Sequence, residues 1–319
     1  MTESRKFDVI VVGGGPAGLC AALYAGRSML KTLLIERGAP GGELLNTELI
    51  EDYIGFESIK GFELAERMAA HALKFGAELV TDNVSAIVRR DDGRFTVTTD
   101  LEARYEAAAI ILTAGGTPSK LGVPGEAEFA GKGVSYCAVC DGHFFRGEVL
   151  AVVGGGDAAC EEAEFLTRYA SKVWLIHRRD HLRASPIIQQ RLRANPKIEI
   201  IWNTVVERVV GDQDKVSHLE LRNVTDDATS TLLVGGMFVF IGFKPNTGVV
   251  QGHFTHDAAG YFITDDHMMS SIPGLFAAGD VRAQLTRQVT TAVGDATTAA
   301  IAVAKYVADR KAKEPVGAA

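Results

Sequence analysis

Cysteine is scarce in this sequence, and its scarcity excludes two classes of protein. The 319 residues include four cysteines, at positions 20, 137, 140 and 160. So few cysteines cannot form the dense disulfide framework of a small secreted domain, and a zinc site would lack a second cysteine pair. The histidines are scattered apart from His253 and His256, so the sequence predicts no metal site.

Long apolar runs and excess positive charge are also missing. No run reaches the length of a membrane span, and the apolar run 7–12 is too short for a signal peptide. The formal net charge is −7, which argues against general nucleic-acid binding. We therefore expect a cytoplasmic protein with no membrane or nucleic-acid partner. In that reducing compartment a C-x-x-C is more often catalytic than structural.

Glycine is abundant, and the first glycine-rich segment has the layout of a dinucleotide-binding turn. A short buried strand leads into Gly13-x-Gly15-x-x-Gly18, and a helix and a second strand follow, ending at Glu36. Gly13 makes the turn, Gly15 lets a pyrophosphate approach the backbone, and Gly18 lets helix and strand pack closely. The helix N-terminus would face the phosphates, and Glu36 would bind ribose hydroxyls.

A second copy of this plan begins 141 residues after the first. Its turn is Gly154-x-Gly156-x-x-Ala159, followed by a helix expected over 159–169 and a strand over 172–176. At the position that matches Glu36 stands His177, followed by two arginines. A carboxylate there would repel a 2′-phosphate, whereas guanidinium groups bind one. This pattern predicts NADPH rather than NADH, the alternative being an ordinary solvated basic face.

A C-x-x-C followed at once by an acid, Cys137-Ala-Val-Cys140-Asp141, lies between the two glycine turns. A close pair of cysteines lets one sulfur form a mixed disulfide while the other resolves it, and the neighbouring carboxyl can move the proton. The order predicts a dithiol connected to two nucleotide cofactors. Cys20 and Cys160 fall in expected helices and should be apolar core residues.

Two segments that break the strand pattern, 113–118 and 242–247, flank the second copy. We interpret them as linkers. After them come an apolar strand that ends at Gly279-Asp280 and a closing helix from about Val289, which should rejoin the first domain. The predicted fold class is α/β, with two Rossmann-like, three-layer ββα nucleotide-binding domains, one inserted into the other. The predicted boundaries are 1–116 with 247–319 for the first domain and 117–246 for the second.

Taken together and in order, these motifs resemble the low-molecular-weight, prokaryotic-type NADPH-dependent thioredoxin reductases. The resemblance covers essentially the whole chain. The motifs that carry it are Gly13-Gly-Gly-Pro-Ala-Gly18, Gly41-Gly42, Cys137-Ala-Val-Cys-Asp-Gly142, Gly154-Gly-Gly, His177-Arg-Arg-x-x-x-Arg183, Phe276-Ala-Ala-Gly-Asp280 and Arg287-Gln-Val289.

The resemblance implies an FAD domain built from both chain ends, an inserted NADPH domain, a homodimer, and thioredoxin as the protein substrate. The residues implied for FAD are Gly13, Gly15, Pro16, Ala17, Gly18, Glu36, Arg37, Gly41, Gly42, Glu43, Leu44, Asp52, Val84, Ala114, Asp280, Arg287, Gln288 and Val289. Those implied for NADPH are Gly154, Gly156, Asp157, Ala158, His177, Arg178, Arg179, Arg183 and Ile241.

The resemblance also implies roles for the catalytic residues. NADPH would reduce the flavin, and the flavin would reduce the Cys137–Cys140 disulfide. Cys140 would be the sulfur nearest the flavin, Cys137 would attack thioredoxin, and Asp141 would donate and accept the proton. The inserted domain would rotate between two positions about the two linkers. His143, Phe144 and Phe145 would form an apolar dock for thioredoxin, or the two phenylalanines would pack inside.

Three residues depart from the family pattern. Glu43 stands where glutamine is common, Asp52 where asparagine is usual, and Ala296 where glycine is frequent. The two added acids bear on the flavin potential, because a carboxylate near the flavin disfavours its reduced, anionic form.

Two alternatives stay open at the level of the sequence. One keeps the fold but takes electrons from ferredoxin, or runs as a dithiol oxidase; relatives of that kind usually lack the second glycine turn and its arginines. The other is a non-catalytic flavoprotein that senses redox state through the cysteine pair.

Overall fold

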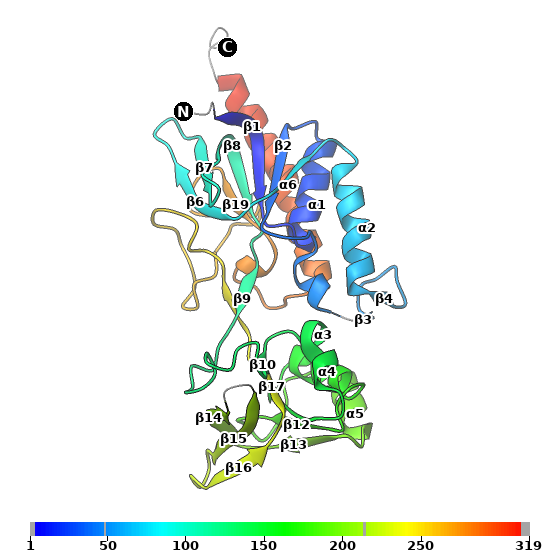
Figure 1. The fold of residues 1–319 in the computed structure, drawn as a ribbon. Helices are drawn as coiled ribbons and strands as arrows, with labels where there is room; N and C mark the ends of the chain where they lie inside the picture. The colour runs from blue at the N-terminus through cyan, green and yellow to red at the C-terminus, as the bar shows by residue number, and fades with distance from the viewer. Residues whose placement is uncertain (1–3, 48, 213–214, 314–319) are drawn as a thin grey trace. The chain divides into compact units, whose positions relative to one another are not determined.

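A computed structural model describes residues 4–47, 49–212 and 215–313 of the chain. The chain divides into two compact units (Figure 1). One unit combines Met1–Thr117 with Lys244–Ala319, and the other is Pro118–Phe243. The outer segments of the sequence thus share one unit, and the middle segment forms its own.

The first unit is built on a seven-stranded sheet of order β5-β2-β1-β8-β7-β6, with β19 also paired to β8. Strands β5, β2, β1, β8 and β19 are parallel, whereas β6 and β7 continue from β8 in antiparallel fashion. The strands of this sheet are β1 (Arg5–Val12), β2 (Thr32–Glu36), β5 (Glu78–Thr81), β6 (Val84–Arg89), β7 (Phe95–Thr99), β8 (Arg104–Leu112) and β19 (Leu275–Ala277). A small hairpin joins β3 (Leu49–Ile50) and β4 (Ile59–Lys60).

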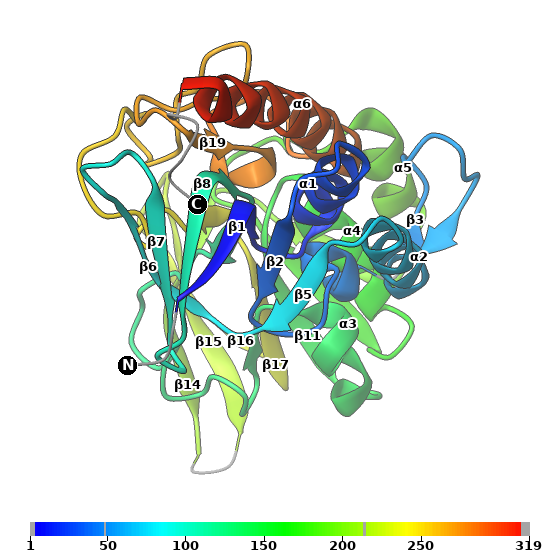
Figure 2. The same cartoon turned by 90° about the horizontal axis from the view of Figure 1, so that it is seen from above.

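Helices cover one face of this sheet (Figure 2). They are α1 (Pro16–Arg27), α2 (Gly61–Leu73) and α6 (Val289–Lys313), with short 3-10 turns η1 (Gly42–Asn46) and η3 (Gly279–Val281). Val9 and Val11 of β1 face these helices, while Ile10 and Val12 face the opposite core. Because β1 is buried on both faces, its sequence is a continuous apolar run rather than an alternation.

The second unit has three layers. A parallel sheet of order β10-β17-β11-β12-β13 lies in the middle, and an antiparallel sheet of order β14-β15-β16 packs on one face. The parallel strands are β10 (Val134–Ser135), β11 (Val149–Gly154), β12 (Lys172–Ile176), β13 (Ile198–Ile201) and β17 (Gly236–Phe240). The antiparallel strands are β14 (Thr204–Gly211), β15 (Val216–Asn223) and β16 (Thr229–Leu233). The other face carries α3 (Ala138–Asp141), η2 (Gly142–Phe145), α4 (Asp157–Leu166) and α5 (Pro186–Ala194).

The segments expected as linkers run side by side. They form β9 (Gly116–Pro118) and β18 (Phe243–Pro245), which pair in a two-stranded sheet. Thr117 donates its hydroxyl to Asn246 Oδ1 at 2.7 Å, and Asn246 Nδ2 donates to the carbonyl of Ala114 at 2.8 Å. The two connecting segments are therefore joined by side-chain hydrogen bonds as well as by backbone pairing.

The structure confirms the α/β fold class with two Rossmann-like glycine turns. Cys20 and Cys160 are free and buried, as expected. The helix expected over 159–169 instead begins at Asp157 and ends at Leu166. It begins earlier because Gly156 already has the extended conformation of an N-cap, and it ends earlier because 167–169 form a separate turn. Among the described residues, no helix is long and apolar enough to cross a membrane.

Candidate active site and nucleotide-binding turns

Cys137 and Cys140 form a disulfide on the second unit. The bond spans the start of the short helix α3, and Cys140 is exposed while Cys137 is half-buried. The backbone N–H of Cys140 donates to Cys137 Sγ at 3.2 Å. After reduction, a donor in this place would stabilise a thiolate on Cys137, because a hydrogen bond to the charged form of a group favours that form.

Asp141 is held beside the disulfide by Ser135, a buried residue at the end of β10. The Ser135 hydroxyl donates to Asp141 Oδ2 at 2.6 Å, and its oxygen accepts from the N–H of Cys137 at 3.1 Å. One serine thus joins the carboxylate to the backbone of the first cysteine. The sequence reasoning did not identify Ser135, because nothing in its spacing distinguishes it from an ordinary strand residue.

A buried carboxylate, Glu126, also supports the segment that leads into the disulfide. Glu126 is 2 % exposed and accepts hydrogen bonds from the N–H groups of Leu121 and Gly122 and from the hydroxyl of Tyr136 at 2.8 Å. Burial, and then the bond to Glu126, raises the pKa of Tyr136 well above its usual value. Since Tyr136 directly precedes Cys137, the hydrogen bond to Glu126 holds the chain segment that leads into the disulfide. This residue was also missed by sequence reasoning.

The first glycine turn has the close contacts that the fingerprint predicts. Gly13 has φ +105°, and a Cβ there would lie 2.6 Å from the carbonyl oxygen of Thr113. A Cβ on Gly18 would lie 1.7 Å from the carbonyl oxygen of Gly13, so helix and turn can approach only without a side chain. At Gly15 a Cβ would meet a single neighbour, Gly42 Cα at 3.8 Å, which leaves the backbone open to a ligand. The turn therefore fits a pyrophosphate group.

Glu36, at the end of β2, lies against this turn. Its carboxylate accepts from the N–H of Gly14 and, at 3.1 Å, from that of Gly38. Arg37 follows and is exposed, while Pro16 opens helix α1 and Ala17 is buried. The acid predicted to bind ribose is thus oriented by backbone donors at the edge of the turn.

The structure brings several distant residues to the first turn. A Cβ on Gly279 would lie 2.9 Å from Cβ of Ala17, so the Gly-Asp turn η3 packs on the start of α1. Burial raises the pKa of Asp280; the Arg287 guanidinium opposes this rise, and the carboxylates of Glu43 and Asp295 add to it. Gly42 and η3 therefore both lie beside the first glycine turn.

The remaining residues predicted for FAD occupy varied places in the first unit. Leu44 and Val289 pack in one apolar cluster, and Val84 and Ala114 in another. The Thr291 hydroxyl donates to the backbone carbonyl of Gln288. The Arg287 guanidinium lies 4.1 Å from the centroid of the Tyr261 ring. Asp52 is exposed in the segment between β3 and β4.

The second glycine turn is joined to the basic loop that follows β12. The N–H of Arg183 donates to the carbonyl of Gly155 at 2.7 Å, and that of Ser185 donates to Asp157 Oδ1 at 2.6 Å. Arg178 and Arg179 are exposed on this loop. The loop is thereby fixed against the turn, and the side chains of its arginines are exposed to solvent.

His177 is buried under the same turn. A Cβ on Gly155 would lie 2.3 Å from its ring, and its Nε2 has no hydrogen-bond partner in the described part of the chain. Burial lowers the pKa of His177, so the ring is neutral at pH 7 and adds no positive charge. A Cβ on Gly156 would meet no atom within 4 Å, so its backbone is open to a ligand. Ala158 is exposed, and Ile241, just after β17, is 38 % exposed.

The residues after the disulfide divide between surface and core. Phe144 is 73 % exposed, with the His143 ring 3.9 Å from its own. Phe145 packs against Phe238 at 5.4 Å. Only the first of the two phenylalanines is available to a partner.

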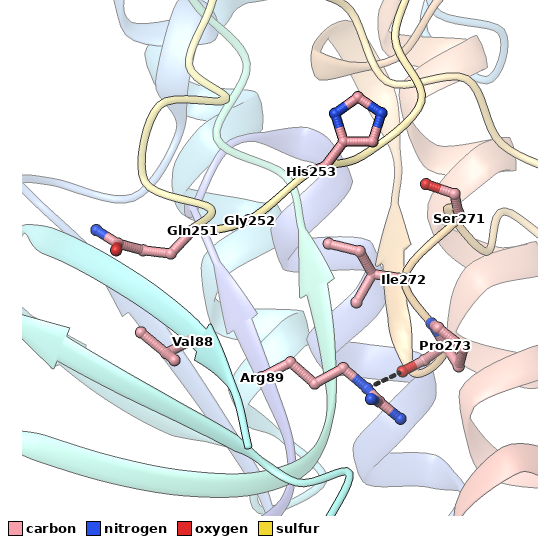
Figure 3. Close-up of a pocket in the computed structure, with 8 residues that line it drawn as sticks. All are labelled: Val88, Arg89, Gln251, Gly252, His253, Ser271, Ile272 and Pro273. Atoms are coloured by element: carbon pink, nitrogen blue, oxygen red, sulfur yellow. Dashed lines mark hydrogen bonds between the residues drawn. The ribbon is translucent and has the colours of Figure 1, made fainter. Parts of the chain in front are cut away.

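An open hollow of about 470 Å³ on the first unit contains none of the predicted site residues (Figure 3). It is lined by Val88, Arg89, Gln251, Gly252, His253, Ser271, Ile272 and Pro273. Arg89 Nε donates to the Pro273 carbonyl at its edge, at 3.1 Å. Within the described residues no group of three or more histidine, cysteine or acidic side chains could hold a metal ion.

Known proteins share both the sequence and this arrangement. Residues 7–296 match the family described as pyridine nucleotide-disulphide oxidoreductase. A thioredoxin reductase of Listeria innocua is 46 % identical over 310 residues, which cover 97 % of each chain, and one of Bacillus subtilis is 45 % identical over 96 % of each chain. The crystal structure of Lactococcus lactis thioredoxin reductase superposes with a TM-score of 0.93 at 44 % identity, covering 95 % of this chain and 99 % of that one. With its two glycine turns and the disulfide between them, this chain belongs to the pyridine nucleotide-disulphide oxidoreductase family.

Proposed function

We propose that the protein is an NADPH-dependent thioredoxin reductase. Overall, NADPH, one proton and the disulfide of thioredoxin give NADP⁺ and the dithiol of thioredoxin. The observation that carries the proposal is the Cys137–Cys140 disulfide on the unit that also bears the second glycine turn and its arginines. The likeness to thioredoxin reductases along nearly the whole chain supports it.

The two cofactors have separate sites in this proposal. FAD would be held by the unit built from both ends of the chain, at Gly13–Gly18, Glu36 and Asp280. NADPH would be held by the inserted unit, at Gly154–Ala159 and the arginines that follow. Bound FAD would accept a hydride from NADPH and pass two electrons on to the disulfide.

The chain's own residues then carry out the exchange with thioredoxin. The Cys137 thiolate, stabilised by the N–H of Cys140, attacks one sulfur of the thioredoxin disulfide and releases the other as a thiolate. Asp141, held by Ser135, takes up the proton of the Cys140 thiol and passes it to this leaving thiolate. The Cys140 thiolate so formed attacks Cys137 Sγ, which restores the Cys137–Cys140 disulfide and frees the second thioredoxin sulfur as a thiolate that takes up a proton from water.

Phe144 is the residue we assign to the thioredoxin contact, because it is exposed and lies four residues after Cys140. Phe144→Ser should raise the KM for thioredoxin several-fold and leave the reduction of bound flavin by NADPH unchanged. Leu233→Ser, which removes an equally exposed apolar residue from β16, is the control. Equal effects of the two substitutions on KM would argue against a contact at Phe144.

Anaerobic NADPH oxidation by the flavin-loaded protein tests the proposal as a whole. Wild-type protein should consume NADPH continuously only when oxidised thioredoxin is present. Cys140→Ser should abolish this turnover and leave bleaching of the flavin by NADPH intact, whereas Cys160→Ala, in the buried core, should retain turnover. Sustained thioredoxin reduction by Cys140→Ser would refute the proposal, and a flavin that NADPH cannot bleach would make ferredoxin the better donor.

We further propose that the protein acts as a homodimer in the cytoplasm. The dimer rests on the likeness to the family, and light scattering of the purified protein at micromolar concentration tests it, since a monomer mass would contradict it. A cytoplasmic location agrees with the two free cysteines, because a reducing compartment keeps them as thiols.

A further inference from the structure

One carboxylate, that of Asp295, accepts hydrogen bonds from both ends of the turn that carries Asp280. Asp295, on α6, accepts from the N–H of Gly279 at Oδ2, 3.2 Å away, and from Arg282 Nη1 at Oδ1, 3.0 Å away. Gly279 and Arg282 flank Asp280 and Val281, the last two residues of η3. The turn therefore cannot shift without breaking a bond to Asp295.

The Arg282–Asp295 pair is largely shielded from water. The side chains of Arg282 and Asp295 are 18 % and 12 % exposed, and Arg282 also donates to Thr264 Oγ1 at 3.2 Å. Removing one partner of such a pair leaves the other charge poorly solvated, so the pair matters more than an exposed ion pair would.

Close packing also restricts the backbone of this turn. Gly279 has φ +73°, and a Cβ there would lie 2.9 Å from Cβ of Ala17, at the start of α1. The turn is thus packed on α1, the helix of the first glycine turn, and Asp295 holds it from a second helix, α6. The backbone at Asp280 is consequently held in place relative to that glycine turn.

We propose that Asp295, with Arg282, is the positioning residue that fixes Asp280 for FAD binding. The inference rests on the proposed function, because it takes the first glycine turn as the FAD site. Asp295 has a second influence on the same residue, since its charge disfavours the ionised form of Asp280. It acts through Asp280 and is assigned no contact with the cofactor.

FAD titration of the apo-protein, followed by flavin fluorescence, tests the inference. Asp295→Ala removes both bonds and should raise the FAD Kd about tenfold or more, whereas Asp295→Asn keeps one acceptor oxygen and should give a smaller rise. Asp309→Asn, an exposed position on the same helix, is the matched control and should change nothing. The Tm of each apo-protein is measured in parallel.

The outcomes separate positioning from general stability. A lower apo Tm with a Kd within twofold of wild type in both Asp295 variants would overturn the inference and leave the proposed function intact. If Asp295→Ala does not fold, Asp295→Asn and Arg282→Lys decide, and unchanged FAD Kd values in both would overturn it. Failure of the wild-type protein to bind FAD would overturn the proposed function and this inference together.

Discussion

The two arginines after His177 should set the preference for NADPH over NADH. Each guanidinium that reaches the 2′-phosphate makes charge-assisted hydrogen bonds worth about 1.5–3 kcal/mol when shielded. Arg178 and Arg179 are exposed, so solvent screening reduces each contribution to about 1 kcal/mol. The double substitution Arg178→Ala/Arg179→Ala should therefore lower kcat/KM for NADPH roughly 30-fold, at about tenfold per 1.4 kcal/mol.

Steady-state thioredoxin reduction with each nucleotide is the assay. The kcat/KM for NADH should stay within about twofold, because NADH has no 2′-phosphate for the arginines to bind. Arg193→Ala, an exposed arginine on α5 bonded to Gln189, is the matched control and should leave both values unchanged. An equal fall for NADPH and NADH would refute the reasoning, because it would indicate damage to the turn. So would an unchanged value for NADPH.

Two further substitutions test the first glycine turn. Gly18→Ala should lower the free energy of unfolding of the apo-protein in urea by about 1–3 kcal/mol and remove bound FAD, since its Cβ would lie 1.7 Å from the Gly13 carbonyl oxygen. Gly38→Ala is the control and should do neither, because a Cβ there meets no atom within 4 Å. Equal effects of the two substitutions would contradict the packing argument. Asp280→Asn should weaken FAD binding yet raise the Tm of the apo-protein at pH 7. Because the pKa of Asp280 is raised on folding, the folded state binds more protons between the unfolded and folded pKa values, so stability falls as pH rises through that window. The gain in Tm should shrink toward pH 4 as the wild-type carboxyl becomes protonated, and a gain that is the same at both pH values would contradict this cause.

The sequence predicted the features that depend on local spacing. Gly13 and Gly18 could be identified because the strand, turn and helix of this motif leave room for no side chain there, and the structure shows both contacts. The basic loop was identified because it begins at the same distance after Gly154 as Glu36 stands after Gly13. The cysteine pair was evident from three residues of separation and a following acid.

The missed residues act through contacts that no short pattern encodes. Glu126 gathers two backbone donors and Tyr136, and Asp295 reaches back to a turn thirteen or more residues earlier in the chain. Glu126 is buried and the Asp295 side chain is 12 % exposed, and the role of each can be inferred only when the groups that donate to it are known. In the sequence each is one of 40 acidic residues, most of which simply face water.

A chain of net charge −7 that binds two anionic dinucleotides needs local sources of positive potential. In the proposed sites, backbone N–H groups at helix N-termini would supply it for the phosphates common to both cofactors. Helix α1 has no acid in its first turn, and in α4 the first-turn carboxylate of Asp157 is occupied by the N–H of Ser185. In the proposed sites, the additional 2′-phosphate of NADPH is the group that would need side-chain cations, which would explain why clustered arginines follow the second turn whereas Glu36 ends the corresponding strand of the first.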